Sequence, residues 1–124
     1  MYKYYNANAN GNFVNDCSIR AISLAENKSW GDTYDELSRI AKRNGILLDD
    51  VNFIDPLLDS RYDRVRTYPK ETVGDFADRH PYGIYLITMN GHITVSKNGT
   101  IYDTFDCRNR ILKYAWEVSR RWIT

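Results

Sequence analysis

Residues 91–107, GHITVSKNGTIYDTFDC, contain two β-rich runs separated by an Asn-Gly pair at 98–99. Such a pair between alternating runs is the strongest short-range signal for a β-hairpin with a two-residue turn. In that register His92 and Asp103 share a face of the hairpin, one diagonal apart, because opposed residues and residues two apart point the same way. The turn therefore predicts a hydrogen bond between them and disfavours Asp106, which has the opposite parity. A three-residue turn would reverse this assignment.

Other β-rich runs flank the hairpin, and helical patterns precede it. Helices first and strands afterwards favour an α+β domain, with N-terminal helices packed on a C-terminal antiparallel β-sheet. The four β-rich runs are GIYLITM (83–89), HITVS (92–96), TIYDTF (100–105) and ILKYAWEV (111–118).

A helix is predicted over 16–27, DCSIRAISLAEN, because apolar residues recur there at helical spacing. Asn15 is a suitable N-cap, since its side-chain oxygen can accept a hydrogen bond from the first turn. Cys17 then occupies the second position of the helix, where free N–H groups and the helix dipole would stabilise a thiolate. The alternative is that Cys17 only fills the apolar stripe, as buried cysteines commonly do. Both interpretations stay open at this stage.

Two more helices are predicted before the strands. One runs from about 32 to 44 and buries Tyr34 on its apolar face. The other covers 72–79, where a Thr followed three residues later by an Asp approximates a capping box. Weaker patterns occupy two further segments: 1–14 is expected to be irregular, and 46–69 to be a short helix or a loop around Pro56.

The composition fits one soluble globular domain over residues 1–124. Hydrophobic residues make up 43% of the chain and charged residues 27%, with a net charge of +1, which argues against a general nucleic-acid binder. The basic, aromatic segment 108–124 is interpreted as an edge strand with a solvated face. Neither a membrane helix nor a secretory signal is expected.

The chain has two cysteines, Cys17 and Cys107, which excludes a disulfide scaffold and argues against a cysteine-built zinc site. Free thiols in a reducing, cytoplasmic compartment are expected instead. The sequence contains no phosphate loop, no dinucleotide motif and no metal-ligand spacing, so we expect no cofactor and no metal.

Cys17, His92 and Asp103 match a known division of labour: a thiolate attacks, an imidazole moves the proton, and a third polar group fixes the imidazole tautomer. The alternative for His92 is an exposed strand-end histidine without a role, and for Asp103 a solvated carboxylate. His80 lies in a His-Pro turn and is expected to have a capping or surface role. Cys107 is expected to be a quiet, buried or edge thiol.

The order Cys, His, Asp, with NDCSIRAI at 15–22 opening a helix and GHITVSKNGTIYDTFD at 91–106 forming a hairpin, resembles the papain-like cysteine peptidase superfamily. More narrowly, TVGDFADRHPYGIYLI at 72–87, with GHITV and GTIYDTFDC, is similar to small proteins of bacteriophages and their bacterial hosts. The resemblance covers roughly residues 12–118. It implies one papain-like domain, in which the helix that carries the nucleophile packs on the sheet that carries the base.

Carried onto this chain, the resemblance implies Cys17 as the nucleophile, His92 as the base and Asp103 as the orienting group. The chain departs from the pattern at the oxyanion hole, because Gly11 stands where papain-type enzymes have a Gln. Asn12 lies one residue closer, and its side-chain N–H could bind an oxyanion together with the Cys17 backbone N–H. We predict Asn12 for this role, although Asn15 is also near.

The sequence therefore predicts a thiol hydrolase, a cysteine peptidase or amidase-like enzyme, that acts on a protein, peptide or small amide through an acyl-enzyme. The same three residues support transglutamination or deamidation, since the cleft and not the triad selects the acyl acceptor. A binding module is a different prediction: a catalytically weak or inactive domain that keeps the fold, such as a phage protein engaging a host factor. The chain is too short for a second lobe, so a shallow site is expected.

Overall fold

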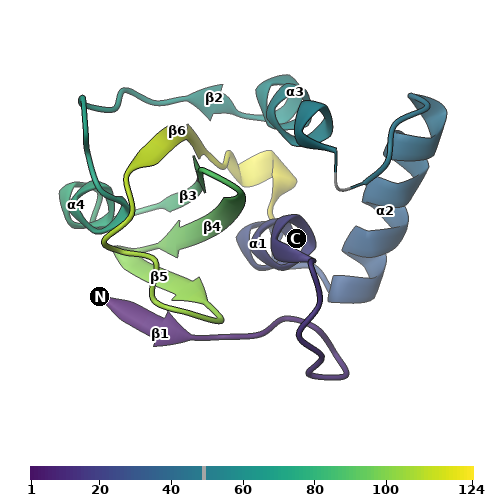
Figure 1. Cartoon of the computed structure of the whole chain (residues 1–124), viewed down its shortest axis with the longest axis horizontal. Helices are drawn as coiled ribbons and strands as arrows, with labels where there is room; N and C mark the ends of the chain where they lie inside the picture. Colours follow the sequence, from purple (N-terminus) through teal and green to yellow (C-terminus); the bar gives the residue numbers. More distant parts are fainter. Residues whose placement is uncertain (49) are drawn as a thin grey trace.

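A computed structural model gives the fold of the chain and describes residues 1–48 and 50–124 (Figure 1). The helices are α1 (Cys17–Glu26), α2 (Trp30–Arg43), α3 (Val51–Arg61), α4 (Val73–Arg79) and a short 3-10 helix, η1 (Arg120–Trp122). The strands are β1 (Tyr2–Tyr4), β2 (Asp63–Arg64), β3 (Ile84–Met89), β4 (His92–Lys97), β5 (Thr100–Asp103) and β6 (Leu112–Glu117). The predicted α+β class is confirmed.

The strands form one sheet in the order β1-β5-β4-β3-β6-β2. All neighbours pair antiparallel except β1 and β5, which are parallel, so the expectation of a purely antiparallel sheet is wrong at this edge. The expectation that residues 1–14 are irregular is wrong for Tyr2–Tyr4 as well. This short strand takes its hydrogen bonds from β5, at the far end of the chain, and such tertiary pairing leaves little trace in local sequence.

The hairpin of β4 and β5 has the predicted two-residue turn. Lys97 pairs with Thr100, and Asn98 and Gly99 both have positive φ angles, of 51° and 80°. Positive φ at both central residues defines the type I′ turn, whose twist matches that of the strands. The second strand ends at Asp103, two residues earlier than the sequence pattern indicated.

Helices cover both faces of the sheet because alternate residues of each strand point to opposite sides. In β3, Leu86 belongs to the core beneath α1, α2 and α3, whereas Ile87 belongs to a second core beneath α4. Figure 1 shows α1 and α4 on opposite sides of the strands. The first core includes Ile22, Leu37, Leu58, Ile93 and Trp116, and the second includes Val73, Phe76, Ile101, Cys107 and Ala115.

The start of α1 differs from the prediction. The N-cap is Asp16 and not Asn15, so Cys17 is the first residue of the helix and not the second. The Asp16 carboxylate does not cap the helix, because it is bound instead by the side chains of Arg20 and Trp30. The thiol therefore lies at the very end of the helix.

The other helices agree with the sequence in type and differ in detail. Helix α2 begins earlier than predicted, with Ser29 accepting a hydrogen bond from the Asp32 amide at 3.0 Å. Tyr34 is 44% exposed, so its predicted burial is wrong; it stacks on Trp30 at the helix surface. Helix α3 continues through Pro56, and α4 has the expected Thr72 cap. Within the described residues, no helix combines the length and apolar character needed to cross a bilayer.

Candidate active site

Three elements meet at one end of the sheet and bring the predicted triad together. Cys17 is the first residue of α1, His92 the first of β4 and Asp103 the last of β5. His92 Nε2 donates a hydrogen bond to Asp103 Oδ2 at 2.7 Å. The hairpin register predicted this bond, and the helix supplies the sulfur from far away in the sequence.

The Cys17 thiol lies near the His92 imidazole and the backbone N–H of Ile93, close enough for both groups to lower its pKa. Because Asp103 already engages Nε2 of the imidazole, Nδ1 is the ring nitrogen left for the sulfur. A carboxylate on one nitrogen fixes the tautomer and orientation of the ring. The order of the three groups is therefore carboxylate, imidazole and thiol, with the carboxylate hydrogen-bonded to the imidazole and the thiol near it.

The pKa shifts of Cys17 and His92 favour an ion pair between the two side chains. Burial by itself raises the pKa of the Cys17 thiol, but hydrogen bonds with His92 and Ile93 and the charges of His92 and Arg20 hold it below its ordinary value. Burial by itself lowers the pKa of His92, but the hydrogen bonds and charges of Asp103 and Cys17 raise it to about 9. Because the thiol pKa is lowered below 9 and the imidazole pKa is raised to about 9, the thiol loses its proton before the imidazolium does, which favours the thiolate–imidazolium pair over the neutral pair.

The end of α1 adds to this effect. The first N–H groups of a helix have no partner within the helix, and they carry the positive end of its dipole. No side chain caps them here, since the Asp16 carboxylate is turned toward Arg20 and Trp30. The amide of Cys17 thus lies in the set of donors that would stabilise a thiolate or an oxyanion.

Asp103 is 4% exposed and has partners on both oxygens. Oδ1 accepts from the Thr104 amide at 2.7 Å and lies 3.4 Å from Nη2 of Arg20. Oδ2 accepts from His92 and, at 3.8 Å, from the Cys107 thiol. Burial by itself raises the pKa of this carboxyl. The hydrogen bond with His92 and the other polar partners together outweigh burial, so the net pKa is lowered and the carboxylate is ionised.

Phe105 forms the outer wall of the site. Its ring centroid lies 4.8 Å from that of His92, and its side chain is 42% exposed. An aromatic ring against the imidazole keeps water from one side of it.

The predicted oxyanion residue Asn12 lies in the exposed segment before α1. Its backbone carbonyl accepts a hydrogen bond from the Asn6 side chain at 3.2 Å, and no hydrogen bond joins its side chain to another described residue. The role of Asn12 in an oxyanion hole stays a prediction.

The two cysteines have opposite surroundings. Cys107 is fully buried in the core beneath α4, and burial, with the Asp103 charge, raises the pKa of its thiol to about 12. Cys17 is partly exposed and has a lowered thiol pKa. Both are free thiols, and only Cys17 has the character of a nucleophile.

Three side chains also lie close enough together to be considered as metal ligands, although the sequence spacing did not indicate such a set. Ligand atoms of His92, Asp103 and Cys107 lie within 4.8 Å of one another, and zinc binds all three residue types. The donor chemistry fits poorly, because the Cys107 thiol is held protonated and the Asp103 carboxylate already accepts from both other residues. We therefore interpret the group as a hydrogen-bonded support of the imidazole.

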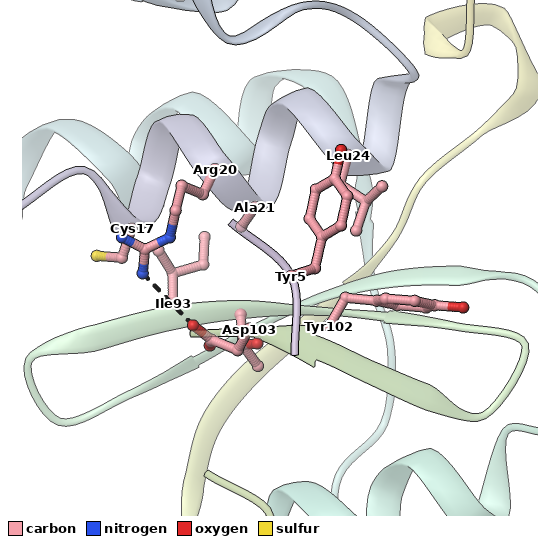
Figure 2. A pocket seen from close by; sticks show the side chains of 9 residues that line it. Tyr5, Cys17, Arg20, Ala21, Leu24, Ile93, Tyr102 and Asp103 are labelled. Carbon is pink, nitrogen blue, oxygen red and sulfur yellow. Dashed lines mark hydrogen bonds and ion pairs between the residues drawn. The ribbon is translucent and has the colours of Figure 1, made fainter. Parts of the chain in front are cut away.

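Figure 2 shows a small cavity between α1 and the sheet, with Cys17 at one end of its lining. Its volume of about 10 Å³ is at most the space of one water molecule. The cavity is lined by Tyr5, Cys17, Arg20, Ala21, Leu24, Ile93, Thr94, Tyr102 and Asp103. A substrate must therefore approach Cys17 from the surface, as expected for a shallow site.

The sequence analysis missed Arg20, which contacts Asp103, and it assigned no role to Phe105, which contacts His92. A signal existed for Arg20, because it follows Asp16 by four residues and Cys17 by three, on one face of the predicted helix. Phe105 had a signal in the hairpin register, which places it opposite His92. The capping role expected for His80 is confirmed: its Nδ1 lies 2.9 Å from the carbonyl oxygen of Phe76, at the end of α4.

No known protein family, no curated protein and no solved structure matches this chain. Function is therefore inferred from the chemistry of the site itself.

Proposed function

We propose that the protein is a thiol hydrolase with a papain-like arrangement, in which Cys17 attacks the carbonyl of an amide or isopeptide bond. The observation that carries this proposal is the chain of contacts from Asp103 through His92 to Cys17, with 2.7 Å between His92 Nε2 and Asp103 Oδ2. A nucleophile beside a base that is oriented by a carboxylate is the signature of activated-nucleophile catalysis.

In the first half of the reaction, the Cys17 thiolate forms a bond to the carbonyl carbon, and the carbonyl oxygen takes the electron pair as an oxyanion. The Cys17 amide at the start of α1 is a donor for that oxyanion. The intermediate then collapses and breaks the carbon–nitrogen bond, while the His92 imidazolium gives its proton to the departing amine. The product is a thioester on Cys17 and a neutral imidazole.

In the second half, the neutral His92 takes a proton from a water molecule as that water attacks the thioester carbon. The carbon–sulfur bond breaks, the acid leaves, and the thiolate and imidazolium are restored. Asp103 stays ionised throughout and keeps the ring in its tautomer. If an amine replaces water as the acceptor, the same site performs acyl transfer.

The small cavity beside Cys17 bears on the substrate. A site that cannot enclose a ligand has to receive a carbonyl presented on a larger surface, so we propose a protein or peptide amide as substrate. The same observation favours a second candidate, a binding module that keeps the triad without turnover, because enzymes for small molecules usually enclose most of the ligand.

The test is mass-spectrometric mapping of an epoxide or chloroacetamide probe on the native protein at neutral pH. We expect selective modification of Cys17, with Cys107 unmodified because its thiol is buried and protonated. We expect His92→Ala to slow the modification by about tenfold or more, because the thiol loses its cationic partner. His80→Ala is the matched control, since the His80 ring hydrogen-bonds to the Phe76 carbonyl of its own helix and has no described contact with the triad.

Modification of Cys107, or of neither cysteine, contradicts the proposal. Equal rates in His92→Ala and the native chain also contradict it. A reactive Cys17 that never releases a product from peptide, amide or ester libraries favours the binding module.

A further inference from the structure

We propose that Arg20 is a positioning residue for the triad: its guanidinium holds the Asp103 carboxylate in the orientation that presents Oδ2 to His92. This inference rests on the proposed thiol hydrolase function and adds a residue to which the sequence analysis assigned no role.

Arg20 lies on α1, one turn after Cys17, and reaches down to the end of β5. Its Nη2 lies 3.4 Å from Asp103 Oδ1, and its side chain is 12% exposed. Figure 2 shows the guanidinium between the helix and the sheet, joined by the dashed line to Asp103 and close to Cys17. The same helix thus supplies the nucleophile and a cation for the orienting carboxylate.

The Arg20 guanidinium is also held by a second carboxylate, that of Asp16. Its Nη1 bonds to Oδ1 of Asp16, whose side chain is 3% exposed. The other oxygen of Asp16 accepts from Nε1 of Trp30 at 2.9 Å, at the start of α2. A planar fork with both ends engaged cannot rotate freely, so Arg20 joins α1, α2 and β5 in a fixed geometry.

This anchor explains how the Asp103 oxygens are shared. Oδ1 faces Arg20 and the Thr104 amide, which leaves Oδ2 for His92. Without the guanidinium, Oδ1 keeps only the amide, and the carboxylate gains freedom to turn away from the imidazole. Arg20 also partly balances the charge of two buried carboxylates, Asp16 and Asp103, which would otherwise lack a permanent cation.

The charged and titratable groups around Cys17 come from every neighbouring element. Helix α1 contributes Asp16 and Arg20, β4 contributes His92, and β5 contributes Asp103. Cys107, in the loop after β5, contacts the Asp103 carboxylate, and the Tyr2 phenol of β1 donates to the Asp103 backbone carbonyl. Among these, the cations His92 and Arg20 lower the pKa of Cys17 against the opposing effect of burial.

The experiment measures the rate of iodoacetamide alkylation of Cys17 against pH, with peptide mapping to separate Cys17 from the buried Cys107. Arg20→Gln is expected to move the midpoint of the rate upward by about one pH unit, because a cation near the thiolate is lost. Arg20→Lys is expected to keep the midpoint close to the native value, because the charge remains. Arg39→Gln is the matched control, since Arg39 is exposed on α2 and away from the triad.

The second readout is the ¹⁵N spectrum of the His92 ring, which separates positioning from charge. A lysine cannot bridge two carboxylates, so Arg20→Lys should change the Nε2 signal toward that of a ring without a carboxylate partner. This variant also decides the question if Arg20→Gln does not fold. Urea unfolding confirms that each variant is folded under the assay conditions.

An unchanged midpoint in Arg20→Gln, or an unchanged His92 spectrum in Arg20→Lys, overturns the role of Arg20 and leaves the proposed function standing. A native Cys17 whose rate rises only with the pH profile of an ordinary thiol contradicts the proposed function instead.

Discussion

His92 is the residue on which both neighbours of the triad act. Its ring is mostly buried, and the bonds to Asp103 and Cys17 raise its pKa from 6.5 to about 9 against the effect of burial. A raised pKa means that His92 binds its proton more tightly in the folded chain than in the unfolded chain. Protonated His92 therefore stabilises the fold fully below pH 6.5, and this contribution is lost as the pH rises through 9.

The raised pKa of His92 predicts how the free energy of unfolding depends on pH. Between pH 6.5 and 9, the native chain should lose about 1–2 kcal/mol of unfolding free energy more than His92→Gln does, after allowance for solvent screening. Gln keeps the polar volume and cannot titrate. Urea unfolding at several pH values measures the difference. Parallel pH profiles for the two chains would show that His92 has an ordinary pKa in the fold.

Local sequence was enough to predict the placement of two triad residues. For the third, it predicted the position in its helix but not the contact with the other two. His92 and Asp103 follow from the Asn-Gly turn, because turn type fixes the register and the register fixes the face. Cys17 was recognisable at a helix start, but no pattern within its own segment showed that the helix end meets the hairpin. The chemistry of Arg20 was missed because its partner lies in β5, far along the chain.

At the scale of elements, the β4–β5 hairpin carries the base and the orienting group, so its turn controls the site. Gly99 has a φ of 80°, and the nearest atom to an added Cβ is Pro81 Cα at 3.5 Å, an ordinary contact. Space is therefore available at Gly99, and conformation alone requires the glycine.

Gly99→Ala should accordingly lower the unfolding free energy by about 1 kcal/mol, the cost of a left-handed backbone for an L-residue. Gly31→Ala is the control, because Gly31 lies in α2 without positive φ and with nothing near an added Cβ. That substitution should be neutral or stabilise by up to roughly 1 kcal/mol. Denaturant midpoints measure both, and a Gly99→Ala variant as stable as Gly31→Ala would contradict the turn geometry.

The elements that sequence patterns missed are those that depend on distant partners. Strand β1 exists because β5 offers it a free edge, and no alternation in three residues could predict that. Helix α3 tolerates Pro56 because the helix packs into the main core through Phe53 and Leu58, which outweighs one lost backbone bond. The capping patterns of α2 and α4, in contrast, are local and were recognisable.

At the scale of the whole molecule, a buried ionic cluster joins the helices that surround α1. Glu26 of α1 is fully buried and accepts from Nη1 of Arg61 at 3.1 Å. Nη2 of Arg61 bonds to Glu36 of α2 at 2.8 Å. Removing one partner of such a cluster leaves a buried charge, so the cluster fixes how α1, α2 and α3 pack and hence where Cys17 lies.

The meeting of α1 with the hairpin is the property of the whole molecule on which the site depends. The fold class followed from the order of helices and strands, whereas this meeting was expected only from resemblance and from the chemistry of three residue types. Core packing between Ile22 of α1 and Ile93 of β4 brings the two together, and such packing has no local signature.

The central claim is that the Cys17 thiol ionises below its ordinary pKa to form a thiolate paired with the His92 imidazolium. Thiolate absorbance near 240 nm, followed against pH in the native chain, measures it directly, because the raised pKa of Cys107, about 12, keeps that thiol protonated. The account predicts a thiolate midpoint below 9 in the native chain and a midpoint shifted upward in His92→Ala. A thiolate that appears only at pH 9 or above, unchanged by the loss of His92, would contradict it.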